Sequence, residues 1–359
     1  MSDGTAARSK GGSILHHADG WIEIEERGDG ARRVTAWPCR GPSPARAWCD
    51  TSYPLALIRS ILRVKGVAWV CDEIARDEDP GQIERYFQDD FLSYVPAAAF
   101  EGKRILDFGC GSGSSSMVLA RLFPRSEIVG VDLFPPLLDV ARRRKDFYGY
   151  ENLTFLLSPA GTALPEGLAP FDFVVLSAVF EHLLPGERRS LMPQVWALVK
   201  KGGVLFLNQT PHRFFPFESH TTGLPLINYL PDRLAHWAAR RFSRRELGRD
   251  SWDTLLRKGI RGSTEREVLR SLGTCAADSR PVLLSPRRAG FRDRVDLWYA
   301  ALSPRYRALK TVCRELLRVV ERAVGTTLVV NLSLAIAKGT SSPGTEEGPC
   351  PDARPPAAS

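Results

Sequence analysis

The sequence predicts an α/β protein with a doubly wound, mostly parallel sheet. Three observations support this fold class: strands and helices alternate from Arg104 to Asn208, a glycine-rich turn joins the first of these strands to its helix, and the composition is typical of a folded soluble chain. Hydrophobic residues make up 43% and charged residues 25% of the 359 residues, which argues against a fibrous, membrane-embedded or largely disordered protein.

A lead-in over residues 1–100 precedes the alternating series, and its first half predicts strands. Residues 21–26 alternate apolar and acidic side chains, a Gly-Asp-Gly turn follows at 28–30, and residues 33–37 can return as a partner strand. We therefore expect a small N-terminal hairpin.

The second half of the lead-in predicts helices. Apolar side chains recur at helical spacing from Leu55 to Val70, with an interruption near Gly66 and a stop at Asp79-Pro80. Residues 81–96 predict a further helix. The lead-in is thus expected to be mostly helical where it meets the core.

Residues 101–210 form the predicted core. Short apolar runs that predict strands alternate with longer periodic runs that predict helices, which is the order of a parallel βαβ sheet. We expect strands at 104–108, 127–131, 153–157, 171–179 and 202–208, and helices at 114–123, 135–148 and 190–201.

The regular order ends after the core. Residues 211–323 begin as a loop rich in proline and phenylalanine and continue as a basic, helical insertion. Strand character returns over 327–337, so residues 324–339 are expected to supply a closing strand at the edge of the sheet. Residues 340–359 are polar and rich in proline and glycine, and we expect them to be disordered.

The positive charge of the chain is concentrated in one segment. Residues 231–323 hold 22 basic and 11 acidic groups, a net charge of +11, whereas the whole chain carries +8. Such a block attracts anionic acceptors, nucleic acid or acidic proteins, but solvated arginine-rich helices are the commoner explanation.

The sequence also indicates the cellular compartment in which the protein is expected. No uncharged stretch reaches the roughly 20 apolar residues of a membrane crossing, and no apolar region follows the basic residues near the N-terminus. The seven cysteines are odd in number and include no Cys-x-x-Cys pair, so neither a disulfide framework nor a structural zinc site is indicated. We expect a cytoplasmic protein without a membrane span, and no sequence feature specifies its oligomeric state.

A cofactor motif lies between the first strand and helix of the core. Gly109, Gly111 and Gly113 occur in the sequence LDFGCGSG, where they allow a tight turn and a close approach of the backbone to a ligand. Their spacing is GxGxG, whereas the dinucleotide fingerprint GxGxxG would place its third glycine at Ser114. Asp132 ends the next strand, where its carboxylate can accept two hydrogen bonds from a ribose diol.

These residues resemble the class I S-adenosylmethionine-dependent methyltransferases. The stretches RILDFGCGSG, VGVDLFPPLLDVAR, FDFVVLSAVFEHL and LVKKGGVLFLN occur in the order and spacing of that family. The resemblance implies a seven-stranded, Rossmann-like sheet and S-adenosyl-L-methionine as the cofactor. It places Gly109, Gly111 and Gly113 along the methionine and ribose, Asp132 at the ribose hydroxyls, Ser177 beside the reactive methyl group, Asp107 at the amino group and Leu133 at the wall of the adenine pocket.

One position departs from the family pattern. Many relatives have an acidic residue after the third strand, next to the adenine, but this chain has Ala160 there. The adenine amine would then depend on backbone carbonyls or a water molecule.

Two stretches supply candidate catalytic residues. Glu181 and His182 follow the fourth strand, at the edge of the sheet where this fold places its active site. His212, Glu218 and His220 lie in the loop after the fifth strand, which is expected to cover the same pocket. One interpretation is that His182 or His220 acts as a general base while Glu181 orients it. The other is that the loop forms a lid whose polar groups bond its own backbone.

A metal site is the alternative for these side chains. The Glu-His pair resembles the ExxEH pattern of metal-dependent small-RNA 2′-O-methyltransferases and of some quinone-biosynthesis methyltransferases. The first glutamate of that pattern is Ala178 here, so one ligand is absent, and we expect a metal-free site.

The expected activity is O-methylation of a small-molecule acceptor, such as a glycan or a secondary-metabolite precursor, which can be anionic. The alternatives are an RNA methyltransferase with a divalent metal, suggested by the basic block, and a cofactor-binding partner protein without catalysis. No RNA-binding module is recognisable in the sequence.

Overall fold

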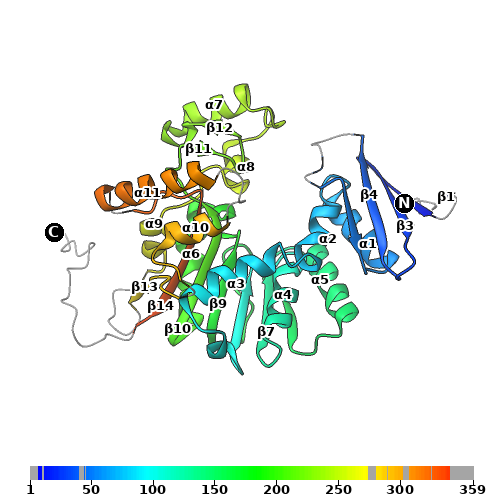
Figure 1. Ribbon diagram of the computed structural model, residues 1–359, viewed down its shortest axis with the longest axis horizontal. Coiled ribbons are helices and arrows are strands. Elements are labelled where there is room, and N and C mark those ends of the chain that lie inside the picture. The colour runs from blue at the N-terminus through cyan, green and yellow to red at the C-terminus, as the bar shows by residue number, and fades with distance from the viewer. Residues whose placement is uncertain are drawn as a thin grey trace.

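A computed structural model of the chain places a central sheet between two layers of helices, with an N-terminal sheet on one side and a helical lid above (Figure 1). The structure describes residues 7–9, 12–39, 44, 46–273, 280–288, 290–301, 307–324 and 326–339. The expected disorder of residues 340–359 lies outside the described residues.

The central sheet has seven strands in the order β13-β14-β10-β9-β6-β7-β8. The five strands of the core pair in parallel, and β14 and β13 add antiparallel at one edge. This confirms the predicted fold class. The strands are β6 (Arg104–Phe108), β7 (Glu127–Asp132), β8 (Leu153–Leu157), β9 (Phe171–Ser177), β10 (Val199–Pro211), β13 (Pro281–Leu283) and β14 (Asn331–Lys338).

Helices bury both faces of this sheet, as a parallel sheet with crossover connections requires. One face packs against α3 (Ile83–Tyr94), α4 (Ser114–Leu122), α5 (Pro135–Tyr148) and α10 (Arg294–Ala301). The other face packs against α6 (Pro185–Leu198) and α9 (Glu265–Ser271).

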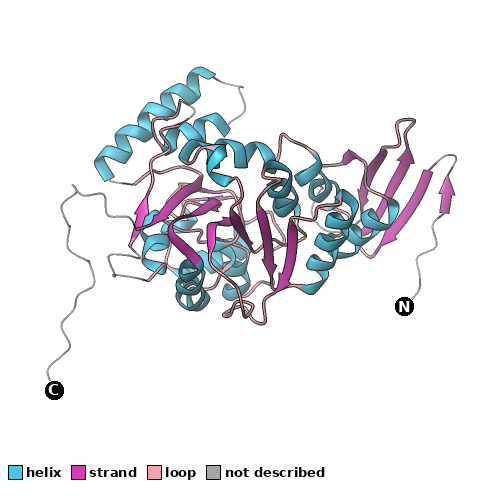
Figure 2. Ribbon diagram, turned by 90° about the horizontal axis from the view of Figure 1, so that it is seen from below, coloured by secondary structure: helices cyan, strands magenta, loops and turns pink. Residues whose placement is uncertain are grey.

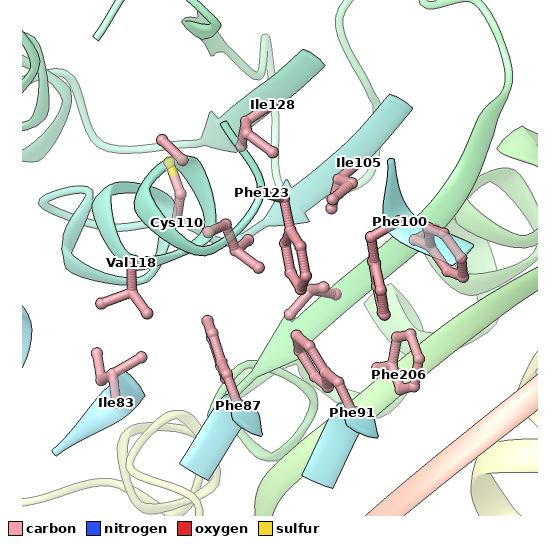
Figure 3. Close-up of a cluster of buried hydrophobic side chains, with 14 of the residues drawn as sticks. Ile83, Phe87, Phe91, Phe100, Ile105, Cys110, Val118, Phe123, Ile128 and Phe206 are labelled. Carbon is pink, nitrogen blue, oxygen red and sulfur yellow. The ribbon is translucent and has the colours of Figure 1, made fainter. Parts of the chain in front are cut away.

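An aromatic cluster attaches the lead-in to the first of these faces (Figure 3). Phe87 and Phe91 of α3 stack with ring centroids 4.6 Å apart, and Phe91 lies 4.4 Å from Phe206 of β10. Phe100, in the short helix η1 (Ala97–Phe100), lies 4.2 Å from both Phe123 and Phe173. Because these rings are buried and in contact, α3 and η1 are part of the core and not a separate extension.

The N-terminal part is larger than expected from the sequence. The expected hairpin is the pair β3 (Gly20–Glu26) and β4 (Arg32–Pro38), but it belongs to a five-stranded antiparallel sheet, visible to one side in Figure 2. The additional strands are β1 (Ala7–Ser9), β2 (Gly12–His17) and β5 (Trp48–Thr51). These three are short and lack a clear apolar alternation, so only pairing with the hairpin makes them strands.

A buried ion network joins the lead-in to the cofactor loop. The helices α1 (Leu55–Lys65) and α2 (Val70–Glu78) pack on the N-terminal sheet. Glu73 Oε1 of α2 lies 3.0 Å from Arg144 Nη1 of α5. Arg144 is fully buried, and its Nη1 also donates to the carbonyl of Ser112 at 2.9 Å and to the hydroxyl of Ser114 at 2.6 Å.

The charges in this network stabilise one another in their ionised forms. Burial opposes ionisation of Glu73, but Arg144 and Lys65 outweigh it and hold the pKa of Glu73 well below its ordinary value. Lys65 Nζ lies 2.9 Å from the second carboxylate oxygen of Glu73. Asp77 Oδ1 lies 3.5 Å from Arg144 Nη2. The network therefore keeps α2, α5 and the glycine loop in one arrangement.

The segment after the core forms a lid and then returns to the sheet. The lid contains β11 (Phe217–Glu218), β12 (Leu224–Pro225), η3 (Ile227–Tyr229), α7 (Asp232–Phe242) and α8 (Trp252–Arg257), which share a small apolar core. The expected helical insertion is thus interrupted by strands. Its strand β13 forms the edge of the central sheet, and β14, which was expected at that edge, lies between β13 and β10. The helix α11 (Arg307–Val324) lies between α10 and β14 in the chain.

Within the described residues, no helix combines the length and the apolar character that a membrane crossing requires. The cysteines of the described part that are free thiols are Cys39, Cys49, Cys71, Cys110 and Cys313.

The buried network makes a prediction for stability. Replacing Arg144 with methionine leaves Glu73 buried without its main counter-charge, so we expect the free energy of unfolding to fall by about 3–5 kcal/mol. Urea unfolding followed by circular dichroism measures this. The double variant Glu73→Gln/Arg144→Met should lose less than the sum of its two single variants, because both remove the same pair. A loss below about 1 kcal/mol for Arg144→Met would show that the network is not needed.

Candidate active site

The three glycines of the cofactor loop adopt backbone conformations that side chains disfavour. The φ angles of Gly109, Gly111 and Gly113 are 74°, 56° and 85°. A Cβ on Gly109 would lie 2.6 Å from Val179, and one on Gly113 would lie 2.7 Å from Ala141. A Cβ on Gly111 would meet nothing within 4 Å. Gly109 and Gly113 are therefore required by packing, whereas Gly111 exposes its backbone to open space where a ligand can approach.

Asp132 lies where the sequence predicts it, at the end of β7 and beside this loop. Its Oδ2 accepts a hydrogen bond from the amide of Gly111 at 2.8 Å, and its Oδ1 accepts one from the amide of Phe134 at 2.9 Å. These two amides fix the orientation of the carboxylate at the pocket wall.

Asp107, at the end of β6, is buried beneath the loop. Its Oδ2 accepts hydrogen bonds from the hydroxyls of Ser115 and Ser116, each at 2.6 Å. Burial raises the pKa of Asp107 to about 6, although the two hydroxyls oppose this shift. Its ionisation is therefore sensitive to any positive charge that a ligand brings to the loop.

One pocket opens beside Asp132, with a volume of about 280 Å³. Its walls come from the strand ends of the core and from the lid. Leu133, Ser158 and Ala160 line one side, and His182 and Arg257 line the other. Leu133 thus lies at a pocket wall, and its role beside the adenine stays a prediction.

A second, smaller pocket of about 100 Å³ is also lined by the glycine loop. Gly111 and Ser177 line it, and so do Lys65 and Arg76 of the lead-in. These two cations were missed in the sequence, because no local motif indicates that α1 and α2 reach this loop. Both are ion-paired with Glu73, Lys65 at 2.9 Å and Arg76 at 3.8 Å, and their remaining N–H groups can donate to a carboxylate in the pocket.

The two strand ends beside the pockets carry strained backbone. Ala178 has a φ of 54° directly after β9, and Gln209 has a φ of 61° within β10. Both line the smaller pocket. Positive φ angles outside glycine cost free energy and concentrate at functional sites, so this strain supports the assignment of the strand ends to the site.

The three predicted catalytic residues lie together. Glu181 and His182 belong to the short helix η2 (Phe180–His182), and His220 comes from the lid. One side-chain N or O atom from each of the three lies within 4.8 Å of the other two. The rings of His182 and His220 have centroids 5.5 Å apart, and His182 Nε2 is 3.8 Å from Glu181 Oε1.

Glu181 is buried, and only one of its two carboxylate oxygens accepts a hydrogen bond from the described residues. The hydroxyl of Thr210 donates to Glu181 Oε2 at 2.8 Å, while Oε1, which faces His182, has no hydrogen-bond partner. Burial raises the pKa of Glu181, and the neighbouring His182 opposes this shift. Glu181 Oε1 can therefore accept a proton from His182 or stabilise a positive charge on its imidazole.

The orientation of His182 is set by a backbone carbonyl. His182 Nδ1 lies 2.7 Å from the carbonyl oxygen of Arg257, so Nδ1 donates to that oxygen, and in the neutral imidazole Nε2 is the nitrogen with the lone pair. Arg257 is itself held by Glu187, with Nη1 2.6 Å from Oε2. Partial burial and the nearby His182 lower the pKa of His220, which favours its neutral form near pH 7.

Gly259 allows the lid to approach these side chains. Its φ is 89°, and a Cβ there would lie 2.9 Å from His220 Nε2 and 3.1 Å from Glu181 Cγ. Neither Arg257, the last residue of α8, nor Gly259, just after it, was expected at the site, because both lie far along the chain from the motif that they meet.

The other two polar residues of the lid loop lie away from the cluster. Glu218 is buried and accepts hydrogen bonds from the amides of Thr221 and Thr222 at 2.7 and 2.6 Å, so it holds the loop. His212 is buried, which lowers its pKa to about 4, and its Nδ1 accepts from the amide of Phe214. The lid-structure interpretation thus applies to these two residues.

The sequence is similar to known methyltransferases. Residues 106–205 match the protein family described as a methyltransferase domain. A trans-aconitate 2-methyltransferase of Methylobacterium radiotolerans is 35% identical over 116 residues, which is 32% of this chain and 40% of that protein. A ubiquinone biosynthesis O-methyltransferase of Methylocella silvestris is 30% identical over 205 residues, which is 56% of this chain and 73% of that protein.

A third relative has a different type of acceptor in its name. A protein-L-isoaspartate O-methyltransferase of Rhodopseudomonas palustris is 30% identical over 137 residues, which is 38% of this chain and 51% of that protein. The chain covers 40 to 52% of the first four relatives, and so spans about half the length of these curated proteins.

The position of Asp132 makes a prediction for cofactor binding. Asp132→Ala should weaken the affinity for S-adenosylmethionine at least tenfold, because a hydrogen bond to a charged group contributes about 1.5–3 kcal/mol. Isothermal titration calorimetry measures this. The matched control is Asp139→Ala, which removes an exposed carboxylate of α5 whose one ion pair within the described residues is with Arg142. Equal affinity in Asp132→Ala and the wild type, or binding of NAD instead, would contradict the assignment.

The buried Asp107 makes a prediction for pH. A cofactor ammonium beside the loop favours the ionised carboxylate, so a proton must be released on binding below the pKa of about 6. We expect the affinity for S-adenosylmethionine to fall about tenfold between pH 7 and pH 5. Asp107→Asn should remove most of this dependence, and the same slope in both proteins would rule out Asp107 as its source.

Proposed function

This chain belongs to the class I S-adenosylmethionine-dependent methyltransferases, and we propose that it methylates a hydroxyl group of a small-molecule acceptor. The observation that carries the proposal is the convergence of Glu181, His182 and His220 between the cofactor side of the sheet and the lid. A general base is needed when the acceptor is an alcohol or a phenol, and imidazole is suited to that role near neutral pH.

The described residues fit the cofactor at the carboxyl ends of the strands. Gly111 leaves space for its approach, Asp132 holds a fixed carboxylate that can accept hydrogen bonds from ribose hydroxyls, and Lys65 and Arg76 suit the methionine carboxylate. When bound, S-adenosylmethionine supplies an electrophilic methyl group on a sulfonium centre.

The roles of the side chains follow from their hydrogen bonds. His182 Nε2 has a lone pair and accepts the proton of the acceptor hydroxyl, because Nδ1 already donates to the carbonyl of Arg257. The free Oε1 of Glu181 stabilises the imidazolium that results. His220, neutral near pH 7, is the second candidate for the base. The lid positions His220 beside Glu181 and His182.

The names of the relatives support an oxygen acceptor. Two of the three described above are O-methyltransferases, one of them acting in ubiquinone biosynthesis. A glycan or a secondary-metabolite precursor with a free hydroxyl is the acceptor class we propose.

The same three side chains also support a second candidate, a divalent metal site. Glu181, His182 and His220 are of the types that bind such ions. Ala178 occupies the position of a fourth ligand in the related ExxEH pattern, however, and the metal-free assignment is therefore preferred.

The catalytic assignment predicts separate effects on turnover and binding. His182→Ala and His220→Ala should each bind S-adenosylmethionine normally, while the variant that loses the base should lose about 100- to 10,000-fold in kcat. His16→Ala, which removes an exposed imidazole of the N-terminal sheet, is the control. Full activity in both variants would leave alignment of the reactants as the main contribution.

Chelation tests the metal alternative. We expect EDTA to leave the activity unchanged; a complete loss that one divalent ion restores would refute the metal-free site.

The acceptor is identified by transfer of a labelled methyl group to a metabolite extract and, in parallel, to total RNA, followed by mass spectrometry. Label in RNA alone would overturn the small-molecule proposal.

A further inference from the structure

The basic segment 231–323 separates into paired and unpaired charges. Several of its cations form ion pairs that hold the lid and the sheet edge together: Arg257 with Glu187, Lys258 with Asp250, Arg261 with Asp232, Arg294 with Glu265, and Arg318 with Asp293 and Asp296. Among the described residues, no carboxylate lies within ion-pair distance of Arg233, Arg240, Arg241 or Arg244. Part of the excess charge is thus exposed on and beside α7.

The outer face of α7 combines these arginines with large apolar side chains. At 3.6 residues per turn, Arg233, Trp237, Arg240 and Arg241 share one side of the helix, with Leu234 at its border. The opposite side, formed by Ala235, Ala238 and Ala239, is buried in the lid. Trp237 is 58% exposed and Leu234 is 53% exposed, although burial would stabilise both side chains.

The apolar surface continues around the N-terminal end of the helix. Leu226 is 59% exposed and Tyr229 is 52% exposed, and Leu230 is also exposed. Phe242, at the end of α7, is exposed and contacts Trp237 edge-on, with ring centroids 5.2 Å apart. Clustered apolar side chains on a surface indicate a site of interaction, whereas single ones do not.

A shallow pocket lies within this face. Arg233, His236, Trp237, Arg240, Arg241 and Gly248 line a space of about 330 Å³. The only hydrogen bond given by one of these guanidinium groups to a protein acceptor, within the described part, runs from Arg240 Nε to the carbonyl of Gly248 at 2.7 Å. Three guanidinium groups around one hollow suit a phosphate group.

We propose that the outer face of α7, with Leu226, Tyr229 and Leu230, docks the protein on a membrane surface that carries anionic lipid headgroups. Arginines that alternate with tryptophan and leucine on an exposed helix are typical of helices that lie in the bilayer interface. Tyr and Trp side chains favour that depth because one part of each is apolar and another is polar. The lipid phosphate would occupy the arginine-lined pocket, while Trp237 and Leu234 enter the acyl boundary.

The place of α7 in the molecule is consistent with docking. The helix lies at the outer end of the lid, away from the central sheet (Figure 1), and no helix of the described residues could cross the bilayer. The attachment is therefore peripheral, reversible and sensitive to salt. It does not depend on the identity of the methyl acceptor.

Cosedimentation with lipid vesicles tests the proposal. The full chain should bind vesicles of mixed phosphatidylglycerol and phosphatidylcholine at about 0.15 M salt, and should bind pure phosphatidylcholine vesicles much more weakly. Arg233→Ser/Arg241→Ser should bind about 25-fold more weakly, because each basic residue near an anionic surface contributes about fivefold. Trp237→Ser, which leaves the charge unchanged, should also weaken binding several-fold.

The matched control is Arg59→Ser/Arg63→Ser. It removes the same charge from exposed positions of α1, on the opposite part of the chain, and should bind vesicles as the wild type does. Circular dichroism and S-adenosylmethionine binding confirm that each variant is folded. Equal losses in the two double variants would show that only net charge matters and would overturn the proposal. Retention of RNA at this salt, with no binding to anionic vesicles, would overturn it in favour of a nucleic-acid surface.

Discussion

The buried pair of Glu73 and Arg144 is the interaction on which the rest of the structure depends. A guanidinium excluded from water costs free energy unless its donors are satisfied, and the partners of Arg144 include Glu73 and Asp77 of α2, Ser112 of the glycine loop and Ser114 at the start of α4. The lead-in, α5 and the cofactor loop therefore have to meet at this point. The consequence is functional as well as structural, because the same contact brings Lys65 and Arg76 to the smaller pocket.

The site itself is assembled from strand ends and closed by the lid. Parallel strands end at one edge of the sheet, so Asp107, Asp132 and Ser177 lie near one another although they are far apart in the chain. The lid then adds His220 to Glu181 and His182, and it can do so because Gly259 has no side chain. One face of the lid thus completes the site, while its opposite face carries the exposed arginines of α7.

Much of this could be predicted from the sequence, because the signals are local. The alternation of strands and helices, the glycine spacing and Asp132 are features of a single continuous segment, and the parallel seven-stranded sheet confirms the fold class they predict. The hairpin of β3 and β4 was predicted, but the other three strands of the N-terminal sheet and the edge strand β13 were missed. These strands are only three to seven residues long, and strand pairing depends on partners and not on intrinsic preference.

The sequence by itself therefore determined the α/β class, the cofactor loop and the family resemblance, because each depends on residues within a few turns of one another. Only the tertiary structure decided which polar residues of the lid join the site. His220 meets Glu181, whereas His212 and Glu218 are buried in the loop that carries them. It also decided which arginines are paired and which are exposed on α7. Both outcomes depend on contacts between segments far apart in the chain, and spacing in the sequence carries no information about such contacts.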